Sequence, residues 1–381
     1  MIVQPGPRLR AGIIGTGFMG TVHANAIRMS GGTIAAVASR SPEAAQAAAS
    51  RFGAEEASSS PEALIARDDI DVVHICTPNS THADFAAQVI ASGKSVVCEK
   101  PLATTLEDAV ELAALSQESG RVAAVPFVYR FYPAVREARA RIRSGEAGPL
   151  WLLHGSYLQD WLADSTTTNW RVDPVLGGSS RAFGDIGVHW CDLTEFVTGH
   201  RITRLMAKTA RAFGVRTPDC GSTQVDTEDG AVVAFETDKG ALGSLVVSQV
   251  SPGRKNRLSF SFDGTNASFR FEQEHPETLW IGEVGSTRAI TVGSESLSAA
   301  EARRYALVPS GHPQGYQDAF TAFVTDAHHA IVGHSVEGLP TFSDGVRAAQ
   351  ITDAVLRSVA ADEWVSVPEL MTVATARERQ R

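Results

Sequence analysis

A histidine and an aspartate in the middle of this chain have a spacing suited to proton transfer. Asp185 and His189 are four residues apart, so on a helix they share one face. A carboxylate beside an imidazole can orient the ring and stabilise its protonated form. The same pair fits an aspartate helix cap followed by a buried histidine bonded to backbone, so spacing alone leaves both interpretations open.

Three glycines near the N-terminus have the spacing of a phosphate-binding turn. The apolar run from Leu9 to Ile14 leads into Gly15-Thr16-Gly17-Phe18-Met19-Gly20, and a helix-like pattern follows. The first glycine permits a tight bend, the second admits a pyrophosphate close to backbone, and the third lets the helix pack on the strand. Because the free N–H groups of the helix face the phosphates, we expect these six residues to bind a dinucleotide.

The second predicted strand, Thr33–Ser39, ends without the acidic residue that usually binds the ribose 2′-hydroxyl. Ser39 and Arg40 stand there instead. A 2′-phosphate would meet no repulsion, and Arg40 could hold it through charge-assisted hydrogen bonds. The sequence therefore favours NADP over NAD. The alternative is an exposed arginine in a loop that still accepts NAD.

Two later strands, Asp71–Cys76 and Lys94–Cys98, lead into polar loops. Ligands of open α/β sheets bind at the carboxyl ends of the strands, so both loops are candidate cofactor contacts. These contacts are Thr77, Pro78, Asn79 and His82 in the first loop, and Glu99 and Lys100 in the second. Asn79 and His82 could equally cap and begin a helix. Lys100 could donate a hydrogen bond to a substrate oxygen, or be a solvated lysine paired with Glu99.

Strand and helix patterns alternate over the first 126 residues, which predicts a doubly wound parallel α/β sheet. Helices are expected at Pro42–Phe52, after Ser60-Pro61 and at Leu106–Ser119, and a sixth strand at Arg121–Phe127. Strands of alternating hydrophobicity dominate afterwards. The later elements are expected to be a helix at Tyr132–Gly145, strands at Leu150–Gln159, Ala231–Phe235, Ala241–Val250, Arg257–Phe262 and Ser268–Glu272, a surface excursion at Gly282–Ser310, helices from Gln317 and at Phe342–Val359, and a strand at Trp364–Val367.

Tryptophans are concentrated at the start of this second part. Four of the six, Trp151, Trp161, Trp170 and Trp190, lie between residues 151 and 190. Sugars present C–H faces that pack on aromatic rings, so the cluster favours a carbohydrate site, although tryptophan also fills cores. We assign Trp161 to the site and Trp151 to packing.

Composition bounds the class of protein. A chain of 381 residues is long for one core, so two domains are expected. A formal net charge of -9 argues against nucleic-acid binding. No apolar run approaches the roughly 20 residues that span a membrane, and no signal peptide is apparent. We therefore expect a cytoplasmic protein with neither nucleic-acid nor membrane partners.

Cysteines and histidines show no metal-binding spacing. Cys76, Cys98, Cys191 and Cys220 are far apart and form no Cys-x-x-Cys pair, so we expect reduced thiols. His328, His329 and His334 are better explained as residues of a surface helix than as ligands. No metal is predicted.

The order and spacing of several motifs resemble the Gfo/Idh/MocA oxidoreductases over nearly the whole chain. Within that family, the stretch Tyr157-Leu158-Gln159-Asp160-Trp161 resembles the branch of levoglucosan dehydrogenase and related sugar dehydrogenases. The motifs are the glycine loop, Thr77-Pro78-Asn79 with His82, Glu99-Lys100-Pro101, Tyr129-Arg130-Phe131-Tyr132-Pro133, Asn169-Trp170-Arg171-Val172-Asp173-Pro174 leading to Gly177-Gly178, and Asp185-Ile186-Gly187-Val188-His189-Trp190-Cys191-Asp192.

The resemblance implies an N-terminal Rossmann domain, residues 1–126, and a C-terminal α/β domain, residues 127–381. The second domain would contain a large, mostly antiparallel, open-faced sheet that binds substrate and joins subunits. A homodimer or homotetramer formed through this sheet is expected.

The resemblance also implies NAD(P)-dependent hydride transfer with a secondary alcohol of a sugar, anhydrosugar or inositol. The family pattern favours catalysis for Lys100, Asp185 and His189, with Asp185 orienting His189. His189 would take the hydroxyl proton while Lys100 hydrogen-bonds the same oxygen, or Lys100 would itself be the base. The other hydroxyls would be held by Tyr129, Gln159, Trp161 and Arg171, with Tyr316 and His312 as further contacts.

Two rival functions stay open on sequence grounds. Some members of the family cleave glycosides with transient use of NAD and no net reduction. Others sense dinucleotide or sugar without turnover, but they tend to lose the lysine or the Asp/His pair. Lys100, Asp185 and His189 are all present here, which argues against the sensor.

Overall fold

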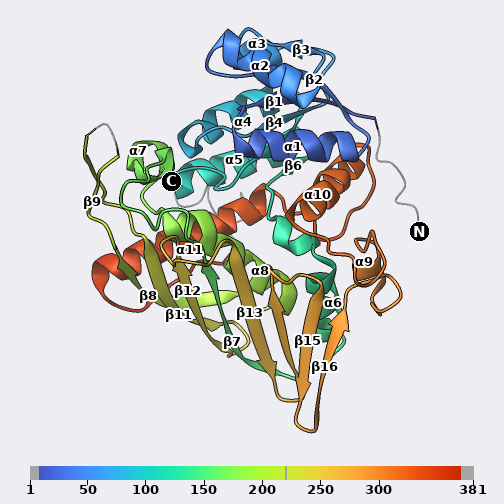
Figure 1. Ribbon diagram of the computed structural model, residues 1–381, viewed down its shortest axis with the longest axis vertical. Coiled ribbons are helices and arrows are strands. Elements are labelled where there is room, and N and C mark those ends of the chain that lie inside the picture. Colours follow the sequence, from blue (N-terminus) through green and yellow to red (C-terminus); the bar gives the residue numbers. More distant parts are fainter. Residues whose placement is uncertain (1–7, 219–220, 370–381) are drawn as a thin grey trace. The chain divides into compact units, whose positions relative to one another are not determined.

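The computed structural model describes residues 8–218 and 221–369, which form two compact units. Within the described residues, the first unit comprises residues 8–128 and Tyr316–Arg347, and the second comprises Tyr129–Gly315 and Ala348–Glu369 (Figure 1). The first break lies close to the predicted boundary at residue 126. The return of residues 316–347 to the first unit differs from the two consecutive domains expected.

The first unit is built on a six-stranded parallel sheet with the order β3-β2-β1-β4-β5-β6. The chain runs outward from β1 on both sides, which is the doubly wound arrangement predicted. Its elements are β1 (Arg10–Ile14), α1 (Phe18–Met29), β2 (Thr33–Ala38), α2 (Pro42–Phe52), β3 (Glu56–Ala57), α3 (Pro61–Ile65), β4 (Val72–Ile75), the 3-10 turn Asn79–Thr81, α4 (His82–Ala91), β5 (Ser95–Cys98), α5 (Leu106–Ser119), β6 (Ala123–Ala124) and α10 (Tyr316–Ile331).

Helix α10 completes the first unit by packing on α1. The Gln317 side-chain nitrogen donates to the carbonyl oxygen of Val22 at 3.2 Å. The ring of Phe320 packs edge-on against His23, with 4.6 Å between centroids. These contacts give α1 its apolar partner, which explains why a segment so late in the sequence belongs to this unit.

The second unit contains a nine-stranded sheet with the order β16-β15-β14-β13-β7-β12-β11-β8-β17. Only β12 and β7 pair in parallel, so the sheet is mostly antiparallel, as predicted. Its strands are β7 (Leu150–Leu158), β8 (Ile202–Ala210), β11 (Gly230–Thr237), β12 (Leu242–Ser248), β13 (Arg257–Gly264), β14 (Ser268–Glu272), β15 (Thr278–Glu283), β16 (Ser286–Thr291) and β17 (Val365–Ser366), and a separate pair is formed by β9 (Val215–Arg216) and β10 (Thr223–Gln224).

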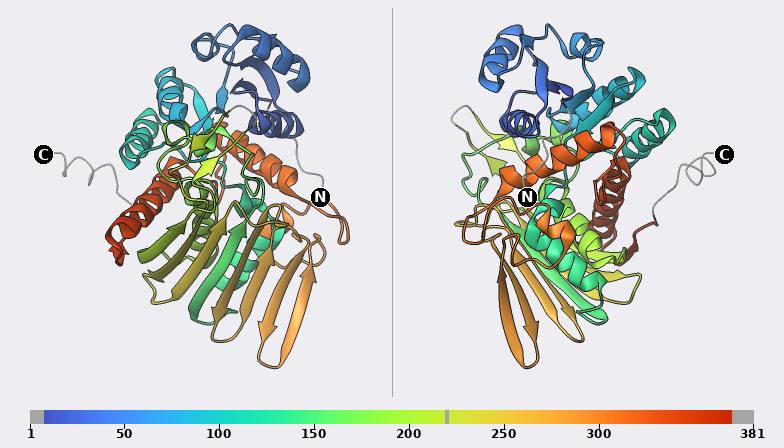
Figure 2. Two further views of the ribbon diagram at one scale, coloured as in Figure 1. Left: turned by 60° about the vertical axis from the view of Figure 1, so that its left-hand side comes forward. Right: turned by 90° about the vertical axis from the view of Figure 1, so that its right-hand side faces the viewer.

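Helices of the second unit lie against one face of this sheet, and the other face is open (right-hand view of Figure 2). The buried Phe260 and Phe262 on β13 and Phe269 on β14 belong to the covered face. The helical segments are α6 (Pro133–Arg143), the 3-10 turn Trp170–Val172, α7 (Pro174–Gly177), a π-turn (Phe183–Gly187), α8 (Val188–Thr198), α9 (Ala300–Arg303), and α11 (Phe342–Ala361), which begins in the first unit.

Trp151 does not pack in the core as expected, since it is 56% exposed. The pairing of β7 with β13 is irregular at this point, because Leu152 faces Asp263 whereas Leu150 faces Gly264. Trp151 is therefore the extra residue of a β-bulge. A bulge disrupts the alternation of side chains along a strand, and this disruption explains the exposure.

The expectation of an irregular excursion over Gly282–Ser310 is wrong in its first part. β15 and β16 form an antiparallel hairpin at the edge of the sheet. Side chains of β16 are largely exposed, so the strand lacks the alternating pattern that marks a half-buried strand.

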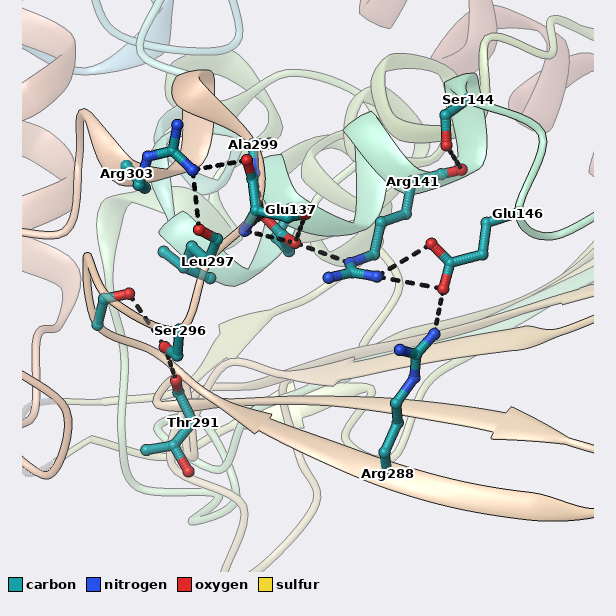
Figure 3. Close-up of polar contacts among 12 residues, drawn as sticks. Glu137, Arg141, Ser144, Glu146, Arg288, Thr291, Ser296, Leu297, Ala299 and Arg303 are labelled. Atoms are coloured by element: carbon teal, nitrogen blue, oxygen red, sulfur yellow. Dashed lines mark hydrogen bonds and ion pairs between the residues drawn. The ribbon is translucent and has the colours of Figure 1, made fainter.

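A polar network fixes the segment after this hairpin to helix α6 (Figure 3). The fully buried carboxylate of Glu137 accepts hydrogen bonds from the backbone N–H groups of Ser298 and Ala299 and from the Arg141 guanidinium. Arg141 continues to Glu146, which in turn pairs with Arg288 on β16. Burial disfavours the charged form of Glu137, but these hydrogen bonds bring its pKa below the ordinary value.

No helix among residues 8–218 and 221–369 is long and apolar enough to cross a membrane. Cys76 and Cys98 carry free thiols, while Cys220 lies outside the described residues. His328 is buried within hydrogen-bond reach of Ser30 rather than on a surface. In the described part of the chain, no three His, Cys, Asp or Glu side chains cluster so as to hold a metal ion.

Candidate active site

The glycine loop of the first unit has the conformation that a phosphate-binding turn requires. Gly15 adopts φ +105°, and a Cβ there would lie 2.5 Å from the carbonyl oxygen of Cys76. A Cβ on Gly20 would lie 2.4 Å from the carbonyl oxygen of Gly15. Gly17 has open space where its Cβ would be and precedes the first residue of α1 without a side-chain cap. The loop therefore fits a dinucleotide pyrophosphate, with room at Gly17 and close packing at the other two glycines.

Side chains next to the glycine loop connect it to β2 and α2. The hydroxyl of Thr16 lies 3.1 Å from that of Ser39, and Arg51 donates to the carbonyl oxygen of Thr16 at 2.6 Å. Phe18 is exposed and Met19 is half-buried. Arg40 is exposed in the turn after β2, where the adenosine ribose of a bound dinucleotide is expected.

The loop after β4 is joined to the loop after β5 by one buried histidine. His82 Nδ1 lies 2.7 Å from the carbonyl oxygen of Pro101, and Nε2 lies 2.9 Å from that of Thr77. Thr77 also accepts from the hydroxyl of Thr81, while Pro78 and Asn79 are half-buried. Burial lowers the pKa of His82. Both ring nitrogens thus face loop backbone, so His82 shapes the predicted cofactor edge through these two loops.

Glu99 and Lys100 lie at the carboxyl end of β5, as predicted. The Glu99 carboxylate is buried and accepts from the backbone N–H of Lys100 at 3.2 Å. Its other oxygen lies 3.0 Å from His23 Nε2, and His23 Nδ1 lies 2.8 Å from His74 Nδ1. Lys100 is half-buried. A row of buried polar groups therefore fixes the backbone beneath Lys100.

His189 lies near the start of α8 in the second unit, immediately after the π-turn Phe183–Gly187. Its side chain is 8% exposed and packs edge-on against the ring of Tyr129, with 5.1 Å between centroids. The ring of Tyr157 also packs on His189, with 6.3 Å between centroids. Burial raises the pKa of Tyr129 to about 12. Because π-turns within helices often mark functional sites, this placement agrees with a chemical role for His189.

Asp185 lies within the π-turn and joins three segments of the second unit. Gln249 donates to one carboxylate oxygen at 2.7 Å, and the Arg171 guanidinium lies 3.5 Å from the other. Arg171 also stacks on the ring of Trp170. The structure thus places the predicted residues Asp185 and Arg171 together, and it adds Gln249, which the sequence did not single out.

Gln159 and Trp161 follow β7 and are hydrogen-bonded to each other. The indole N–H of Trp161 donates to Gln159 Oε1 at 2.9 Å, and Gln159 Nε2 donates to Asn256 Oδ1 at 2.8 Å. Asn256 also accepts from the hydroxyl of Tyr157. Tyr157 lay in a motif that the sequence marked, whereas Asn256 carried no signal because only the sheet brings it here.

The two remaining predicted contacts, Tyr316 and His312, occupy different units. Tyr316 begins α10 in the first unit, with its ring 5.8 Å from that of Phe320. His312 is exposed in the second unit, in a turn where its ring nitrogen lies near the carbonyl oxygen of Pro309.

Comparison with known proteins identifies the family. Residues 9–127 match the model of an oxidoreductase family with an NAD-binding Rossmann fold, and residues 135–270 match a Gfo/Idh/MocA C-terminal domain. The chain belongs to the Gfo/Idh/MocA oxidoreductase family. The fold and family predicted from the sequence are confirmed, and the chain is an NAD(P)-dependent oxidoreductase.

Several members of the Gfo/Idh/MocA family match almost the entire chain. Levoglucosan dehydrogenase of Pseudarthrobacter phenanthrenivorans is 33% identical, over 95% of this chain and 99% of that enzyme. An inositol 2-dehydrogenase of Rhizobium meliloti is 26% identical, over 94% and 99%. A structure of levoglucosan dehydrogenase in complex with NADH and levoglucosan has a TM-score of 0.89 and 31% identity, covering 95% of this chain and 100% of that one.

Proposed function

We propose that this enzyme transfers a hydride between a nicotinamide cofactor and a secondary alcohol of a sugar, anhydrosugar or inositol. The observation that carries the proposal is the set of polar side chains in the second unit that contact one another. Arg171 lies beside Asp185, Trp161 donates to Gln159, and the ring of His189 packs on Tyr129. Hydroxyl-rich ligands need such convergent donors and acceptors beside an aromatic ring. The 33% sequence identity with levoglucosan dehydrogenase supports the same substrate class.

Each polar group has a distinct role in this proposal. In the second unit, His189 accepts the proton of the substrate hydroxyl. In the first unit, Lys100 stabilises negative charge that develops as the alcohol is oxidised. Asp185 fixes the π-turn that precedes His189 through its contacts with Gln249 and Arg171. The bound nicotinamide supplies the hydride acceptor.

Absorbance at 340 nm tests the proposal directly. The purified protein would be incubated with NAD or NADP and a panel of sugars, anhydrosugars and inositols. We expect reduced nicotinamide to accumulate with at least one member of the panel. Release of free sugar from a glycoside without net reduction would favour glycoside cleavage instead, and binding of dinucleotide without either product would favour a sensor.

For the cofactor, we propose a preference for NADP that depends on Arg40. A charged hydrogen bond contributes roughly 1.5–3 kcal/mol, so Arg40→Ala should weaken NADP binding about tenfold or more and leave NAD little changed. The dissociation constants of both cofactors would be measured by fluorescence titration.

Arg51 provides the matched control for Arg40. Its guanidinium bonds the glycine-loop backbone at Thr16 rather than the end of β2, so Arg51→Ala should weaken both cofactors alike. If Arg40→Ala also affected both cofactors equally, Arg40 would not bind a 2′-phosphate.

We further propose that copies of the chain associate through the open face of the second-unit sheet, as a dimer or tetramer. Val232, Leu242 and Val246 are exposed on the neighbouring strands β11 and β12. Contiguous exposed apolar side chains commonly mark protein interfaces. Light scattering would measure the mass in solution, and a monomer would contradict the proposal.

A cytoplasmic location is also proposed. Cys76 and Cys98 form no disulfide, and burial raises the pKa of both thiols, which disfavours the reactive thiolate form. Free thiols are typical of reducing compartments. Cell fractionation that recovers the protein outside the cytoplasm would contradict this assignment.

A further inference from the structure

Two tyrosines that pack on His189 form a closed ring of hydrogen bonds with Asn256. The hydroxyl of Tyr157 donates its one proton to Asn256 Oδ1 at 2.7 Å. The contact of 2.5 Å between the hydroxyls of Tyr157 and Tyr129 must therefore be donated by Tyr129. Asn256 Nδ2 in turn donates to the hydroxyl oxygen of Tyr129 at 3.3 Å. The donors and acceptors thus run in one direction around the ring.

A second chain of hydrogen bonds ends on the same asparagine. Trp161 donates to Gln159, and Gln159 donates to Asn256 Oδ1. The oxygen of Asn256 therefore accepts from Tyr157 and Gln159 together. One amide connects the tyrosine pair beside His189 with the two residues that are proposed to bind sugar hydroxyls.

The backbone that carries Asn256 is itself held in place. Its N–H and that of Lys255 both donate to Glu274 Oε1, at 2.8 and 3.0 Å. The Lys255 ammonium lies 2.7 Å from the carboxylate of Asp160, which stands between Gln159 and Trp161 in the sequence. The asparagine and the segment that it contacts are therefore fixed to each other twice, once by the amide and once by this ion pair.

We propose that Asn256 is a positioning residue that determines how the sugar site of the second unit is arranged. Its amide sets the direction of the Tyr129–Tyr157 hydrogen bond and the orientation of Gln159, and through Gln159 it sets that of Trp161. The role in sugar recognition rests on the proposed function. The hydrogen-bond arrangement is independent of the proposed function and is tested separately.

Two variants of Asn256 separate its acceptor from its donor. Asn256→Leu has a similar volume and makes none of the hydrogen bonds. Asn256→Asp retains an acceptor for Tyr157 and Gln159 but cannot donate to Tyr129. Because Asn256→Leu removes the three side-chain hydrogen bonds of Asn256 and Asn256→Asp removes only the one to Tyr129, we expect Asn256→Leu to raise the KM for sugar about tenfold or more and Asn256→Asp to raise it less.

Coenzyme affinity and a second asparagine provide the controls. The glycine loop belongs to the first unit, so the dissociation constant of NADH should stay within about twofold in both variants. Asn266 is exposed in the turn between β13 and β14, and Asn266→Leu should leave the KM unchanged. An Asn256→Leu enzyme whose KM stays within about twofold of wild type would overturn the role in sugar recognition.

The hydrogen-bond arrangement has a readout that needs no substrate. The indole N–H resonance of Trp161 is identified in nitrogen-15 spectra by its loss in Trp161→Phe. In Asn256→Leu we expect this resonance to shift and to exchange faster with water, while Asn266→Leu leaves it in place.

If Asn256→Leu fails to fold, the isosteric Asn256→Asp is measured instead by proton NMR, and the change is then expected at the hydroxyl proton of Tyr129 rather than at the Trp161 indole. Unchanged resonances would overturn the arrangement. Absence of activity on every sugar, with the resonance shifted as expected, would instead count against the proposed function and the recognition role that rests on it.

Discussion

Replacing Lys100 or His189 with alanine should lower the turnover of sugar by at least about 10²-fold while the coenzyme still binds. General acid–base catalysis typically contributes 10²–10⁴-fold in rate, and stabilisation of the developing alkoxide contributes a similar factor. Initial rates at 340 nm give kcat, and quenching of protein fluorescence gives the dissociation constant of NADH. The rate of each variant is also measured as a function of pH. The variant whose pH–rate profile loses its acidic limb lacks the residue that accepts the proton.

Each of these variants has a control within its own unit. Lys94 precedes β5, at the opposite end of the strand from Lys100, and Lys94→Ala should keep normal turnover. His200 follows α8, is buried and contacts the hydroxyl of Thr237, so His200→Gln tests the loss of a histidine away from the site. Turnover near the wild-type value in Lys100→Ala or His189→Ala would remove that residue from the mechanism.

Loss of Asp229 should destabilise the second unit more than any surface substitution. Its carboxylate lies between the guanidinium groups of Arg181 and Arg216, whose side chains are both 0% exposed. Removing one partner of a buried ion pair typically costs about 3–5 kcal/mol, because the other charge is left uncompensated. We therefore expect Asp229→Ala to lower the free energy of unfolding by roughly this amount.

The same substitution should loosen the loop that carries Trp161. Arg216 donates to the carbonyl oxygens of Leu162, Asp164 and Thr167. Without the Asp229 carboxylate, the guanidinium is no longer held in position, and these three hydrogen bonds should weaken. The variant should therefore also show a raised KM for sugar under conditions in which it is folded.

Urea unfolding followed by tryptophan fluorescence reports selectively on this unit, because every tryptophan of the chain belongs to it. Lys208→Ala is the control, since Lys208 and Asp362 form a pair that is 60% and 67% exposed and such pairs contribute about 0–1 kcal/mol. Equal effects of the two substitutions would contradict a structural role for the buried pair.

The pH dependence of this contribution has a definite sign. Burial disfavours the ionised form of Asp229, but hydrogen bonds from Arg181 and from backbone N–H groups hold its pKa below the ordinary value. A carboxylate with a depressed pKa stabilises the folded protein at neutral pH, and this stabilisation is lost as the pH falls through the pKa of the folded state. The difference in stability between wild type and Asp229→Ala should therefore shrink in acid.

Local signals explain why the first unit could be predicted closely. Helix α2 has the predicted bounds, Pro42–Phe52, because the Ser41 hydroxyl accepts from the N–H of Ala44 and Gly53 ends the helix at φ +67°. Helix α5 is bounded in the same way by Thr105 and Gly120. Caps, prolines and glycines act within a few residues, so a single sequence contains them.

Contacts between distant segments explain what the sequence could not show. Gln249 reaches Asp185 across 64 residues, and Asn256 reaches Gln159 across 97. Neither belongs to a recognisable motif, and their positions follow from the register of β12 and β13 against β7. The residues proposed for the site stand in local motifs that the sequence shows, whereas the residues that contact them across the sheet do not.

The late return of α10 to the first unit has a consequence for synthesis on the ribosome. Roughly 190 residues separate the end of the first segment at Val128 from Tyr316, which at about 5–20 residues per second takes about 10–40 s. During that interval, the face of α1 around His23 lacks Phe320 and the rest of its partner helix. The nascent first unit therefore presents an apolar surface until α10 has been synthesised, and this surface is where a chaperone would bind.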